Sequence, residues 1–417
     1  MKVTTYEAIP GEVKKCVLLY SGGLDTSVMI RWIQENYGAE VITLTVDVGQ
    51  KGKDLEKVKE KALKLGATQA FIIDAKKEFA NEYVARAIKA NALYEGEYPL
   101  SSALSRPLLA KWAVKIAEKV GADTIAHGCS GKGNDQVRFD ITITSMNPKM
   151  KVIAPVREWN LSREEEIEYA KKNGIPIPVD INRPYSIDEN LWGRSIECGE
   201  LEYPEKEPPE EVFEWCLPLN KTPNEPEYVE LEFKEGIPVA LNGKEMELWE
   251  LISKLNEIGG KHGVGIIDHM EDRIVGLKSR EVYEAPAATI IIKAHKELEK
   301  LVCTIHENWF KPLIDKKWSE LVYSGLWVEP LREELETFIN AINQKVNGKV
   351  KLKLFKGSVR IVARESSNAL YDLKLATYEK GQLFNQKASP GFIEIFGLQT
   401  KMAYQVFKKW KGSGKED

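Results

Sequence analysis

The chain has 417 residues, of which 43% are hydrophobic and 29% charged, and its 59 basic and 63 acidic residues give a formal net charge of −4. This length predicts two or three domains, and the near balance of charge argues against a protein whose main task is to bind nucleic-acid phosphates. The sequence shows no signal-peptide pattern and no apolar run of about 18 residues, so we expect a cytoplasmic protein without a membrane segment.

Short apolar runs alternate with amphipathic helical patterns over about the first 175 residues. The apolar runs predict strands at 15–20, 41–46, 70–73 and 124–126, and the helical patterns predict helices at 26–34, 55–65, 108–120 and 162–172. Strands that alternate with helices indicate βαβ units and a parallel sheet covered on both faces. Gly174 and Pro176 follow the last of these helices and predict a domain boundary near residue 175.

The pattern changes after this boundary. Residues 227–233 alternate apolar and acidic side chains, which predicts an antiparallel strand with one dry face. We expect helices at 248–258 and 297–309, a hairpin at 350–364 that turns at Lys356-Gly357, and a solvated loop at 202–214. These features predict an α+β second domain over 176–375. We expect an irregular tail at 376–417, either an arm packed on a partner subunit or a disordered end.

The strongest chemical signal is the segment Ser21-Gly22-Gly23-Leu24-Asp25-Thr26-Ser27, which follows the first predicted strand. Its glycines allow the backbone to approach a ligand, and its hydroxyls and the free amides of the following helix can converge on an anion. The first strand-to-helix turn is also where α/β sheets bind phosphates. The alternative is a plain turn followed by an Asp or Thr N-cap. The segment is not a Walker A loop, because it lacks the glycine spacing and the lysine of that motif.

Two motifs carry a resemblance to known families. SGGLDTS, at 21–27, resembles the pyrophosphate loop of the N-type ATP pyrophosphatases, and HGCSGKGNDQVRF, at 127–139, resembles the signature of the argininosuccinate synthase family. The resemblance extends to ALYEGEYPL, KVIAPVREW, NGIPIPV, ENLWGRS, GKHGVG and DRIVGLKSR, and it covers nearly the whole chain.

This resemblance implies a fold and a domain order. The expected fold is α/β, with an N-terminal parallel-sheet nucleotide-binding domain of the adenine-nucleotide alpha-hydrolase-like type at 1–175. An α+β synthetase domain that binds citrulline would follow at 176–375, and a C-terminal oligomerisation arm at 376–417.

The resemblance also implies the reaction, a carbon–nitrogen ligation in arginine biosynthesis. Citrulline would be activated by ATP as a citrullyl-adenylate, and aspartate would then displace AMP to give argininosuccinate. Mg²⁺ would travel with the ATP phosphates, so we expect no metal site made by the protein itself. The expected partners are these small-molecule substrates and further copies of the chain, in a homotetramer whose C-terminal arms cross between subunits. No nucleic-acid or membrane partner is expected.

The motif match assigns residues to three sites. The ATP site is implied to contain Tyr20, Ser21, Gly22, Gly23, Leu24, Asp25, Thr26, Ser27, Val46, Gly128 and Lys132. The aspartate site is implied to contain Ser130, which stands in place of the family's usual threonine, together with Asn134 and Asp135. The citrulline site is implied to contain Tyr98, Ser102, Asn134, Arg138, Ser186, Ser195, Glu271 and Tyr283.

The implied roles follow the chemistry of each side chain. Arg138 would bind a carboxylate through the fork of its guanidinium. Glu271 would hold the α-ammonium group of citrulline, and Asp135 that of aspartate. Ala103 stands where some family members have serine, so the hydroxyl contact is assigned to Ser102.

Several of these residues have a purely structural alternative. Asn134-Asp135 could be a helix N-cap pair and Ser186 could cap a turn; Tyr283 could be a core aromatic, and Glu271 and Lys132 could lie on a solvated face. We interpret His127 as a packed or ligand-orienting group rather than a proton shuttle, and Cys129 as a small packing residue.

Two other functions remain as alternatives. One is another adenylating ATP pyrophosphatase, such as a tRNA-modifying thiolase, which would need paired reactive cysteines and a basic RNA-binding face. The charge of −4 and the scattered cysteines argue against it. The usage of the cysteines also fits a reducing compartment; they are Cys16, Cys129, Cys198, Cys216 and Cys303. The other alternative is a non-catalytic sensor of ATP or amino acids, which would not need two amino-acid sites.

Overall fold

The computed structural model describes residues 11–52, 54–159, 163–177, 185–378 and 383–412. The chain divides into two compact units, residues 1–368 and 369–417. The described residues of the first unit form one parallel and two antiparallel sheets. Among the described residues, no helix combines the length and the apolar character needed to cross a membrane. The borders expected near residues 175 and 375 stay predictions.

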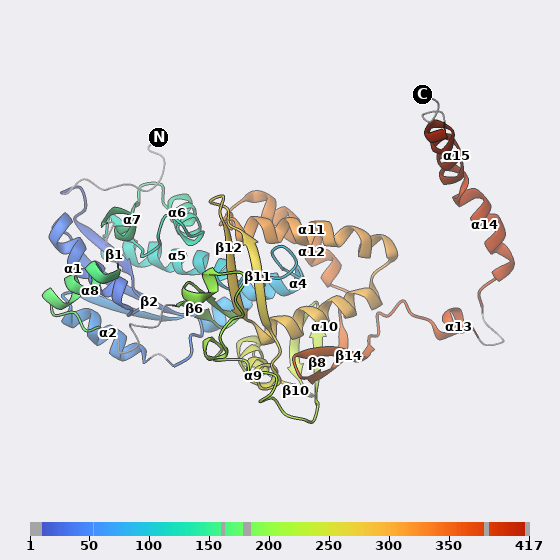
Figure 1. Ribbon diagram of the computed structural model, residues 1–417, viewed down its shortest axis with the longest axis horizontal. Helices are drawn as coiled ribbons and strands as arrows, with labels where there is room; N and C mark the ends of the chain where they lie inside the picture. The colour runs from blue at the N-terminus through green and yellow to red at the C-terminus, as the bar shows by residue number, and fades with distance from the viewer. Residues whose placement is uncertain (1–10, 53, 160–162, 178–184, 379–382, 413–417) are drawn as a thin grey trace. The chain divides into compact units, whose positions relative to one another are not determined.

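A five-stranded parallel sheet with the strand order β3-β2-β1-β4-β5 forms the N-terminal part of the first unit. Figure 1 labels two of its strands, β1 and β2, in the blue part of the chain. The strands of this sheet are β1 (Lys15–Leu19), β2 (Glu40–Asp47), β3 (Gln69–Asp74), β4 (Thr124–Ala126) and β5 (Lys151–Ile153). The first four confirm the predicted strands. The chain order reverses between β1 and β4, and ligands of such sheets bind at this switch point, outside the carboxyl ends of the strands. The two motifs found in the sequence begin at these two strand ends.

Helices accompany this sheet. They are α1 (Leu24–Tyr37), α2 (Leu55–Lys64), α3 (Lys76–Phe79), a π-helical turn (Ala80–Val84), α4 (Ala85–Lys89), α5 (Ser101–Val120), α6 (Asp135–Met146), α7 (Pro155–Trp159) and α8 (Arg163–Lys172). The structure confirms the predicted helices, although α5 begins seven residues before its predicted start at Leu108. Ser162, the predicted first residue of α8, lies outside the described residues.

Alternate side chains of β1 enter two different cores, as the period of a strand requires. Cys16 and Leu18 pack in one core with Ile30 of α1, and Val17 and Leu19 pack in the other with Leu108 of α5. Because both faces of β1 are covered, the strand reads as a continuous apolar run in the sequence.

Two antiparallel sheets follow, with the orders β11-β12-β7-β6 and β10-β9-β8-β13-β14. Their strands are β6 (Ser186–Asn190), β7 (Gly193–Glu197), β8 (Glu227–Lys234), β9 (Ile237–Leu241), β10 (Lys244–Glu245), β11 (Ile266–Asp272), β12 (Lys278–Glu284), β13 (Gly348–Phe355) and β14 (Ser358–Glu365). The alternation in β8 is confirmed, since Val229, Leu231 and Phe233 are all buried. The predicted hairpin is also confirmed: Lys356 and Gly357 have φ of +48° and +77° and connect β13 to β14.

One predicted helix is wrong, because the expected helix at 297–309 spans two helices. The helices of this part are α9 (Leu248–Lys261), α10 (Pro286–Val302), α11 (Ile305–Tyr323) and α12 (Pro330–Asn343). Thr304 separates α10 from α11 and forms a capping box with Glu307. Thr304 Oγ1 accepts the Glu307 N–H at 3.4 Å, and Glu307 Oε2 accepts the Thr304 N–H at 2.8 Å. This local signal for a helix start outweighs the continuous apolar period.

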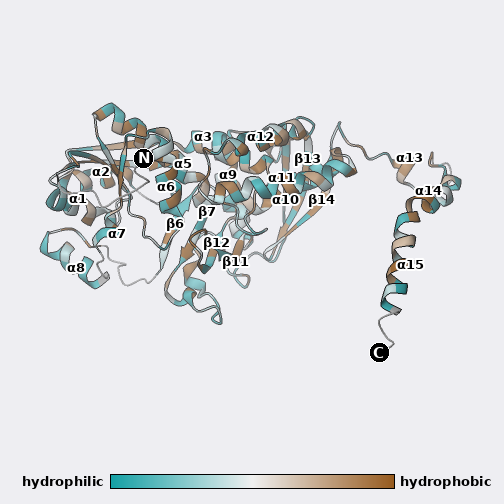
Figure 2. Cartoon of the chain, turned by 90° about the horizontal axis from the view of Figure 1, so that it is seen from above, coloured by the Kyte–Doolittle hydropathy of each residue, from teal (hydrophilic) through white to brown (hydrophobic). Residues whose placement is uncertain are grey.

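The second unit contains α13 (Leu373–Ala376), α14 (Ser389–Phe396) and α15 (Leu398–Gly412). The expectation of an irregular tail is therefore wrong for residues 389–412. Apolar side chains are frequent on these helices (Figure 2). No residue of α14, all of which the structure describes, is buried, and Ile395 and Phe396 are 73% and 76% exposed. The unit thus presents apolar surface that it does not cover itself.

Candidate active site

The segment between β1 and α1 is a tight loop at the carboxyl edge of the parallel sheet. Gly22 has a φ of +80°, which residues with a side chain rarely adopt. A Cβ at this position would lie 3.0 Å from both methyl carbons of Val58. Gly23 is the N-cap of α1. The two glycines therefore present main chain at the N-terminus of α1, which is the arrangement that favours an anion.

Hydroxyl groups hold this loop in shape. Ser27 Oγ donates to the Gly23 carbonyl at 2.6 Å and lies 3.1 Å from the Tyr20 hydroxyl. Ser21 Oγ lies 3.1 Å from Thr26 Oγ1 and accepts the Gly23 N–H at 3.3 Å. Ser27 is fully buried, whereas Ser21 is exposed. The inner hydroxyls thus stabilise the loop, and Ser21 is the one at its surface.

This loop lines a cavity of about 710 Å³, a volume in the range of small-molecule sites. Six of the predicted ATP residues line the cavity: Tyr20, Ser21, Gly22, Gly23, Val46 and Gly128. They come from the ends of the adjacent strands β1, β2 and β4, which explains why segments far apart in the sequence meet here. Outside the lining are Leu24, Asp25, Thr26, Ser27 and Lys132; Leu24 is buried in the core and Lys132 is exposed.

His127 lines the same cavity and holds the start of the glycine-rich loop that follows β4. Its Nδ1 accepts the Cys129 N–H at 3.2 Å, and its Nε2 lies 2.7 Å from Asp140 Oδ1, to which it donates. Arg157 Nη1 lies 3.1 Å from Asp140 Oδ2. Burial acts to raise the pKa of Asp140, but the His127 hydrogen bond and the Arg157 charge outweigh it and leave this pKa below its ordinary value. Both ring nitrogens of His127 are engaged, which agrees with an orienting role.

Asp135, the first residue of α6, lies between two arginines. Arg106 approaches Asp135 Oδ2 with Nε at 2.9 Å and Nη2 at 2.7 Å, and Arg138 Nη1 lies 2.7 Å from Oδ1. Burial acts to raise the pKa of Asp135, but the two guanidinium charges hold it well below its usual range. Arg106 Nη2 also lies 2.7 Å from Asp188 Oδ2. The carboxylate of Asp135 is therefore ionised and fixed in orientation.

Glu271 on β11 is enclosed by tyrosines. Tyr283 donates to Glu271 Oε2 at 2.5 Å, and Tyr323 donates to Oε1 at 2.6 Å. Tyr98 stacks on Tyr283 with ring centroids 4.3 Å apart. Glu271 is only 4% exposed, so the alternative of a solvated face is wrong. A buried carboxylate that accepts hydrogen bonds from two phenols can still accept one from a further donor, such as an ammonium group.

Three more predicted residues lie close to this cluster. Tyr98 OH accepts the Ser102 N–H at 2.9 Å, and Ser102 Oγ donates to Asp188 Oδ2 at 2.5 Å. Ser195 Oγ donates to the Asp188 carbonyl at 3.3 Å, across the β6–β7 pair. Asn134 Nδ2 donates to Tyr323 OH at 2.8 Å.

The remaining predicted residues lie at the surface. Ser186 is exposed at the start of β6, two residues before Asp188. Ser130 and Lys132 are exposed in the loop between β4 and α6, where the Lys132 carbonyl accepts a hydrogen bond from Arg273 Nη1 at 3.2 Å. The structure thus gathers most of the predicted amino-acid-site residues into one cluster and leaves Ser130 and Ser186, together with the predicted ATP residue Lys132, exposed.

Sequence reasoning missed Arg106, Asp188 and Tyr323. For Arg106 a signal existed: it lies four residues after the predicted Ser102, so both share one helix face once α5 begins at Ser101. Pro107 lies inside α5, although proline is ordinarily confined to the first turn of a helix. Tyr323 lies nearly two hundred residues from Asn134 in the sequence, and no local pattern marks it.

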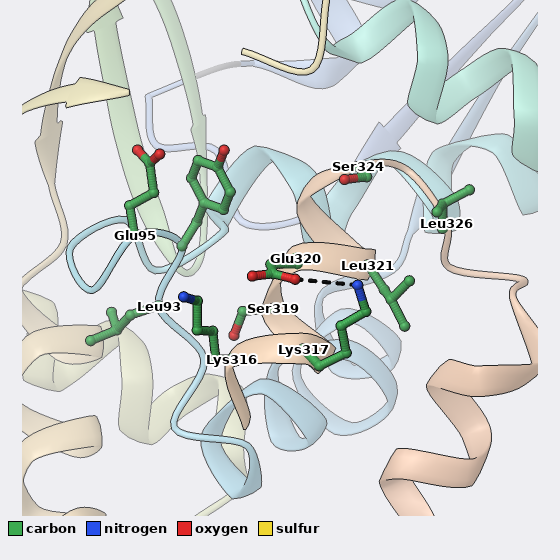
Figure 3. A pocket seen from close by; sticks show the side chains of 10 residues that line it. Leu93, Glu95, Lys316, Lys317, Ser319, Glu320, Leu321, Ser324 and Leu326 are labelled. Carbon is green, nitrogen blue, oxygen red and sulfur yellow. Dashed lines mark hydrogen bonds and ion pairs between the residues drawn. The ribbon is translucent and has the colours of Figure 1, made fainter. Parts of the chain in front are cut away.

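A second cavity, of about 430 Å³, lies beside α11 (Figure 3). It is lined by Leu93, Tyr94, Glu95, Lys316, Lys317, Ser319, Glu320, Leu321, Ser324 and Leu326. None of these is a predicted site residue, so we place the candidate active site at the larger cavity. Within the described ranges, no group of three or more His, Cys, Asp or Glu is placed to hold a metal ion.

Comparisons with known proteins agree with this architecture. Residues 15–176 match the model of the arginosuccinate synthase N-terminal HUP domain, and residues 185–403 match that of the arginosuccinate synthase C-terminal domain. The argininosuccinate synthase of Pyrococcus furiosus is 60% identical over 94% of this chain and 95% of the relative. Those of Symbiobacterium thermophilum and Anoxybacillus flavithermus are 55% and 58% identical, over 95% and 93% of this chain and 98% and 96% of the relatives. The expected α/β fold with an N-terminal nucleotide-binding domain is thereby confirmed. The family models and the relatives match the chain over nearly its full length, so the chain belongs to the argininosuccinate synthase family.

Proposed function

We propose that this chain is a carbon–nitrogen ligase that joins citrulline to aspartate with cleavage of ATP to AMP and pyrophosphate, a step of arginine biosynthesis. The observation that carries the proposal is the position of Arg106. It lines the ATP-sized cavity, and its guanidinium also contacts Asp135 and Asp188 of the amino-acid cluster. A nucleotide in the cavity and an amino acid at the cluster would therefore be neighbours.

The proposed ATP site is the loop from Tyr20 to Ser27 together with Val46, Gly128 and Lys132. The amides at the start of α1 and the hydroxyl of Ser21 would bind the phosphates, and the inner hydroxyls of Thr26 and Ser27 would keep the loop in its bound shape. Val46 at the end of β2 would contact adenine through its main chain. The lining of the cavity supports this assignment for the residues at its wall.

The proposed citrulline site is built around Glu271 and Arg138. Glu271 would accept the α-ammonium group while Tyr283 and Tyr98 pack beside it, and Ser102, Ser186 and Ser195 would complete the site. Three of the five N–H donors of Arg138 are directed at Asp135 and at the carbonyl of Tyr323. The remaining two, one on each terminal nitrogen, suit the two oxygens of a carboxylate.

The proposed aspartate site consists of Ser130, Asn134 and Asp135. Asp135 would hold the amino group of aspartate, which must lose a proton before it can attack. Because the carboxylate is fixed by Arg106 and Arg138, it would keep this amino group aimed in one direction.

The proposed chemistry has two displacements. The ureido oxygen of citrulline attacks the α-phosphorus, and the bond from this phosphorus to pyrophosphate breaks. The aspartate nitrogen then attacks the ureido carbon, and the carbon–oxygen bond to AMP breaks. The protein would contribute orientation and fixed charges rather than a covalent intermediate of its own.

We also propose that Mg²⁺ arrives with ATP. Mg²⁺ usually keeps several waters and binds through one or two carboxylates plus substrate phosphates, and Asp25 is the exposed carboxylate in the first turn of α1. When bound, the ion would neutralise part of the charge on the leaving pyrophosphate.

The state of the cysteines gives no support to the thiolase alternative. All five are free thiols. Burial raises the pKa of Cys129 well above its ordinary value, with the Asp135 charge acting in the same direction. A thiol that resists ionisation is a poor nucleophile, so Cys129 fits the packing role.

Pyrophosphate release tests the proposed function. The purified chain would be incubated with ATP and Mg²⁺, with citrulline and aspartate each present or omitted. We expect release that depends on citrulline, and argininosuccinate only when aspartate is also present. Release that is independent of citrulline would refute the proposal.

We further propose that the protein is cytoplasmic and that it forms a homotetramer. The uncovered apolar surface of α14 and α15 supports the assembly into an oligomer.

A further inference from the structure

Tyr323, the last residue of α11, connects the two amino-acid sites through its hydroxyl. Tyr323 OH donates to Glu271 Oε1 at 2.6 Å and accepts from Asn134 Nδ2 at 2.8 Å. Asn134 Oδ1 in turn accepts the Ile274 N–H at 3.1 Å, so its amide group has a defined orientation. The hydroxyl of Tyr323 therefore sets the position of Glu271, a residue of the proposed citrulline site, and of Asn134, a residue shared by the citrulline and aspartate sites.

The main chain of Tyr323 holds a third ligand. Its carbonyl accepts Arg138 Nε at 3.0 Å and Nη2 at 2.8 Å. Carbonyls at a helix C-terminus lack intrahelical partners and carry partial negative charge, so they suit a guanidinium. Gly325 allows this approach: it has a φ of +76°, and a Cβ there would lie 2.8 Å from the Arg138 Cα.

The ring of Tyr323 is fixed by stacking. It lies on Tyr94 with centroids 3.4 Å apart and planes 3° apart, and Tyr94 OH donates to the Asp272 carbonyl at 2.7 Å. Residues on both sides of Tyr323 in the chain, Leu321 and Ser324, line the cavity of Figure 3 together with Tyr94. Burial, reinforced by the Glu271 charge, raises the pKa of Tyr323 far above its ordinary value, so its hydroxyl keeps the proton that it donates.

We propose that Tyr323 is a positioning residue that orders both amino-acid sites at once: its hydroxyl orients Glu271 and Asn134, and its carbonyl orients Arg138. This inference rests on the proposed function and on the roles proposed there for these three residues. None of the residues predicted from the sequence lies on α11. The inference therefore adds this helix to the elements that build the site.

The test removes the hydroxyl alone, with Tyr323→Phe. The ring, its stacking on Tyr94 and the carbonyl bonds to Arg138 remain. We expect the KM for citrulline and the KM for aspartate to rise together, each by about 5- to 30-fold, because a hydrogen bond to a charged group is lost and an amide loses its partner. The KM for ATP should change by less than about two-fold, because Tyr323 does not line the ATP cavity.

The matched control is Tyr169→Phe, which also removes a hydroxyl that donates to a glutamate, Glu35 Oε2 at 2.5 Å; Tyr169 packs against the core that contains the side chains of α1. This variant should leave both KM values unchanged. A fall in kcat or melting temperature of Tyr323→Phe with both KM values at wild type would show a merely structural role and overturn the inference. A rise in only one of the two KM values would also contradict it.

Glu271→Gln separates this failure from failure of the proposed function. If Glu271→Gln raises the citrulline KM while Tyr323→Phe does not, the proposed site stands and the role of Tyr323 is refuted. If Glu271→Gln leaves the citrulline KM unchanged, the proposed citrulline site itself is wrong.

Discussion

The Arg106 guanidinium contacts one oxygen of the Asp135 carboxylate through two nitrogens, with Nε at 2.9 Å and Nη2 at 2.7 Å from Oδ2. The contact joins α5 to α6, and the same Nη2 reaches Asp188 on β6 at 2.7 Å. A single guanidinium thus contacts Asp135, on a helix that packs beside the parallel sheet, and Asp188, on a strand of an antiparallel sheet. Arg106 also lines the nucleotide cavity, so the proposed nucleotide and aspartate sites share this residue.

We predict that Asp135→Ala abolishes turnover or raises the aspartate KM strongly, while ATP binding stays nearly intact. The variant removes the carboxylate that would orient the amino group and leaves Arg106 and Arg138 without this partner. Removing one partner of a hydrogen-bonded charge pair to a bound ligand costs about 2–5 kcal/mol, so kcat/KM for aspartate should fall by at least about 30-fold. Steady-state kinetics and nucleotide titration measure the two effects.

Asp268→Ala is the matched control for this variant. Asp268 on β11 pairs with Arg280 through the same two guanidinium nitrogens, Nε at 2.8 Å from Oδ1 and Nη2 at 2.6 Å from Oδ2, but in an exposed position. Exposed pairs contribute about 0–1 kcal/mol, so the control should keep normal kinetics. Normal aspartate kinetics in Asp135→Ala itself would show that the loop does not bind aspartate.

Gly22→Ala should weaken ATP binding. The new methyl group would require a φ of +80° and would press against Val58 at 3.0 Å. The positive φ alone costs roughly 1–2 kcal/mol, and the loop would relieve the strain by moving away from the bound-phosphate shape. We expect a higher KM for ATP and a lower melting temperature, read by kinetics and by thermal unfolding.

Gly38→Ala distinguishes loop geometry from backbone strain. Gly38 has a φ of +67° at the C-terminus of α1, but a Cβ at this position would have no neighbouring atom within 4 Å. This control should lower the melting temperature with an unchanged KM for ATP. If both variants lowered stability equally and neither changed the KM, the close packing of Gly22 would have no role in ATP binding.

The nucleotide-binding half of the fold is predictable because its signals are local. β1 and β2 are buried on both faces, so they appear as short apolar runs, and the loop from Ser21 to Ser27 follows β1 directly. The strand order, which only the structure shows, then places this loop beside Gly128. The fold class and the contiguous motifs therefore follow from the sequence alone.

Contacts that depend on distant segments are not predictable in this way. Tyr323 meets Glu271 and Asn134 only because α11 ends beside two other elements, and no periodicity encodes this. The Thr304 capping box encodes the break between α10 and α11, but the apolar period of the two helices runs through it. The glycines of the tail predict irregular structure, yet Gly391 lies inside α14 and Gly397 ends it.

Acid should reveal the Asp140–His127 pair. The folded state holds the pKa of Asp140 below its ordinary value, so this carboxylate contributes stability above its unfolded pKa of about 3.9. That contribution is lost as the pH falls through the lower folded pKa. We predict that Asp140→Asn, measured by denaturant unfolding between about pH 6 and 3, loses less stability on acidification than the wild type does.

Exposed Asp372→Asn serves as the reference for this titration. Asp372 caps the short helix α13 in the second unit, where its side chain accepts the Lys374 N–H at 2.7 Å. The pH dependence of its unfolding should match that of the wild type. Equal slopes for Asp140→Asn and the wild type would mean that the His127–Asp140 bond gives no pH-dependent stability.

The apolar surface of the second unit gives the last prediction. Ile395 and Phe396 of α14 are 73% and 76% exposed, and burying a side chain of this size contributes about 1.5–3 kcal/mol. If this surface packs on a partner subunit, the double variant Ile395→Asp/Phe396→Asp should dissociate the proposed homotetramer, because the interface would have to bury two charges in each copy. Size-exclusion chromatography with light scattering measures the mass.

The control variant Gln399→Asp/Thr400→Asp adds the same charge at polar positions of α15 and should keep the wild-type mass. A tetramer in both variants would show that α14 lies outside the interface, and a wild type that elutes as a monomer would refute the assembly itself.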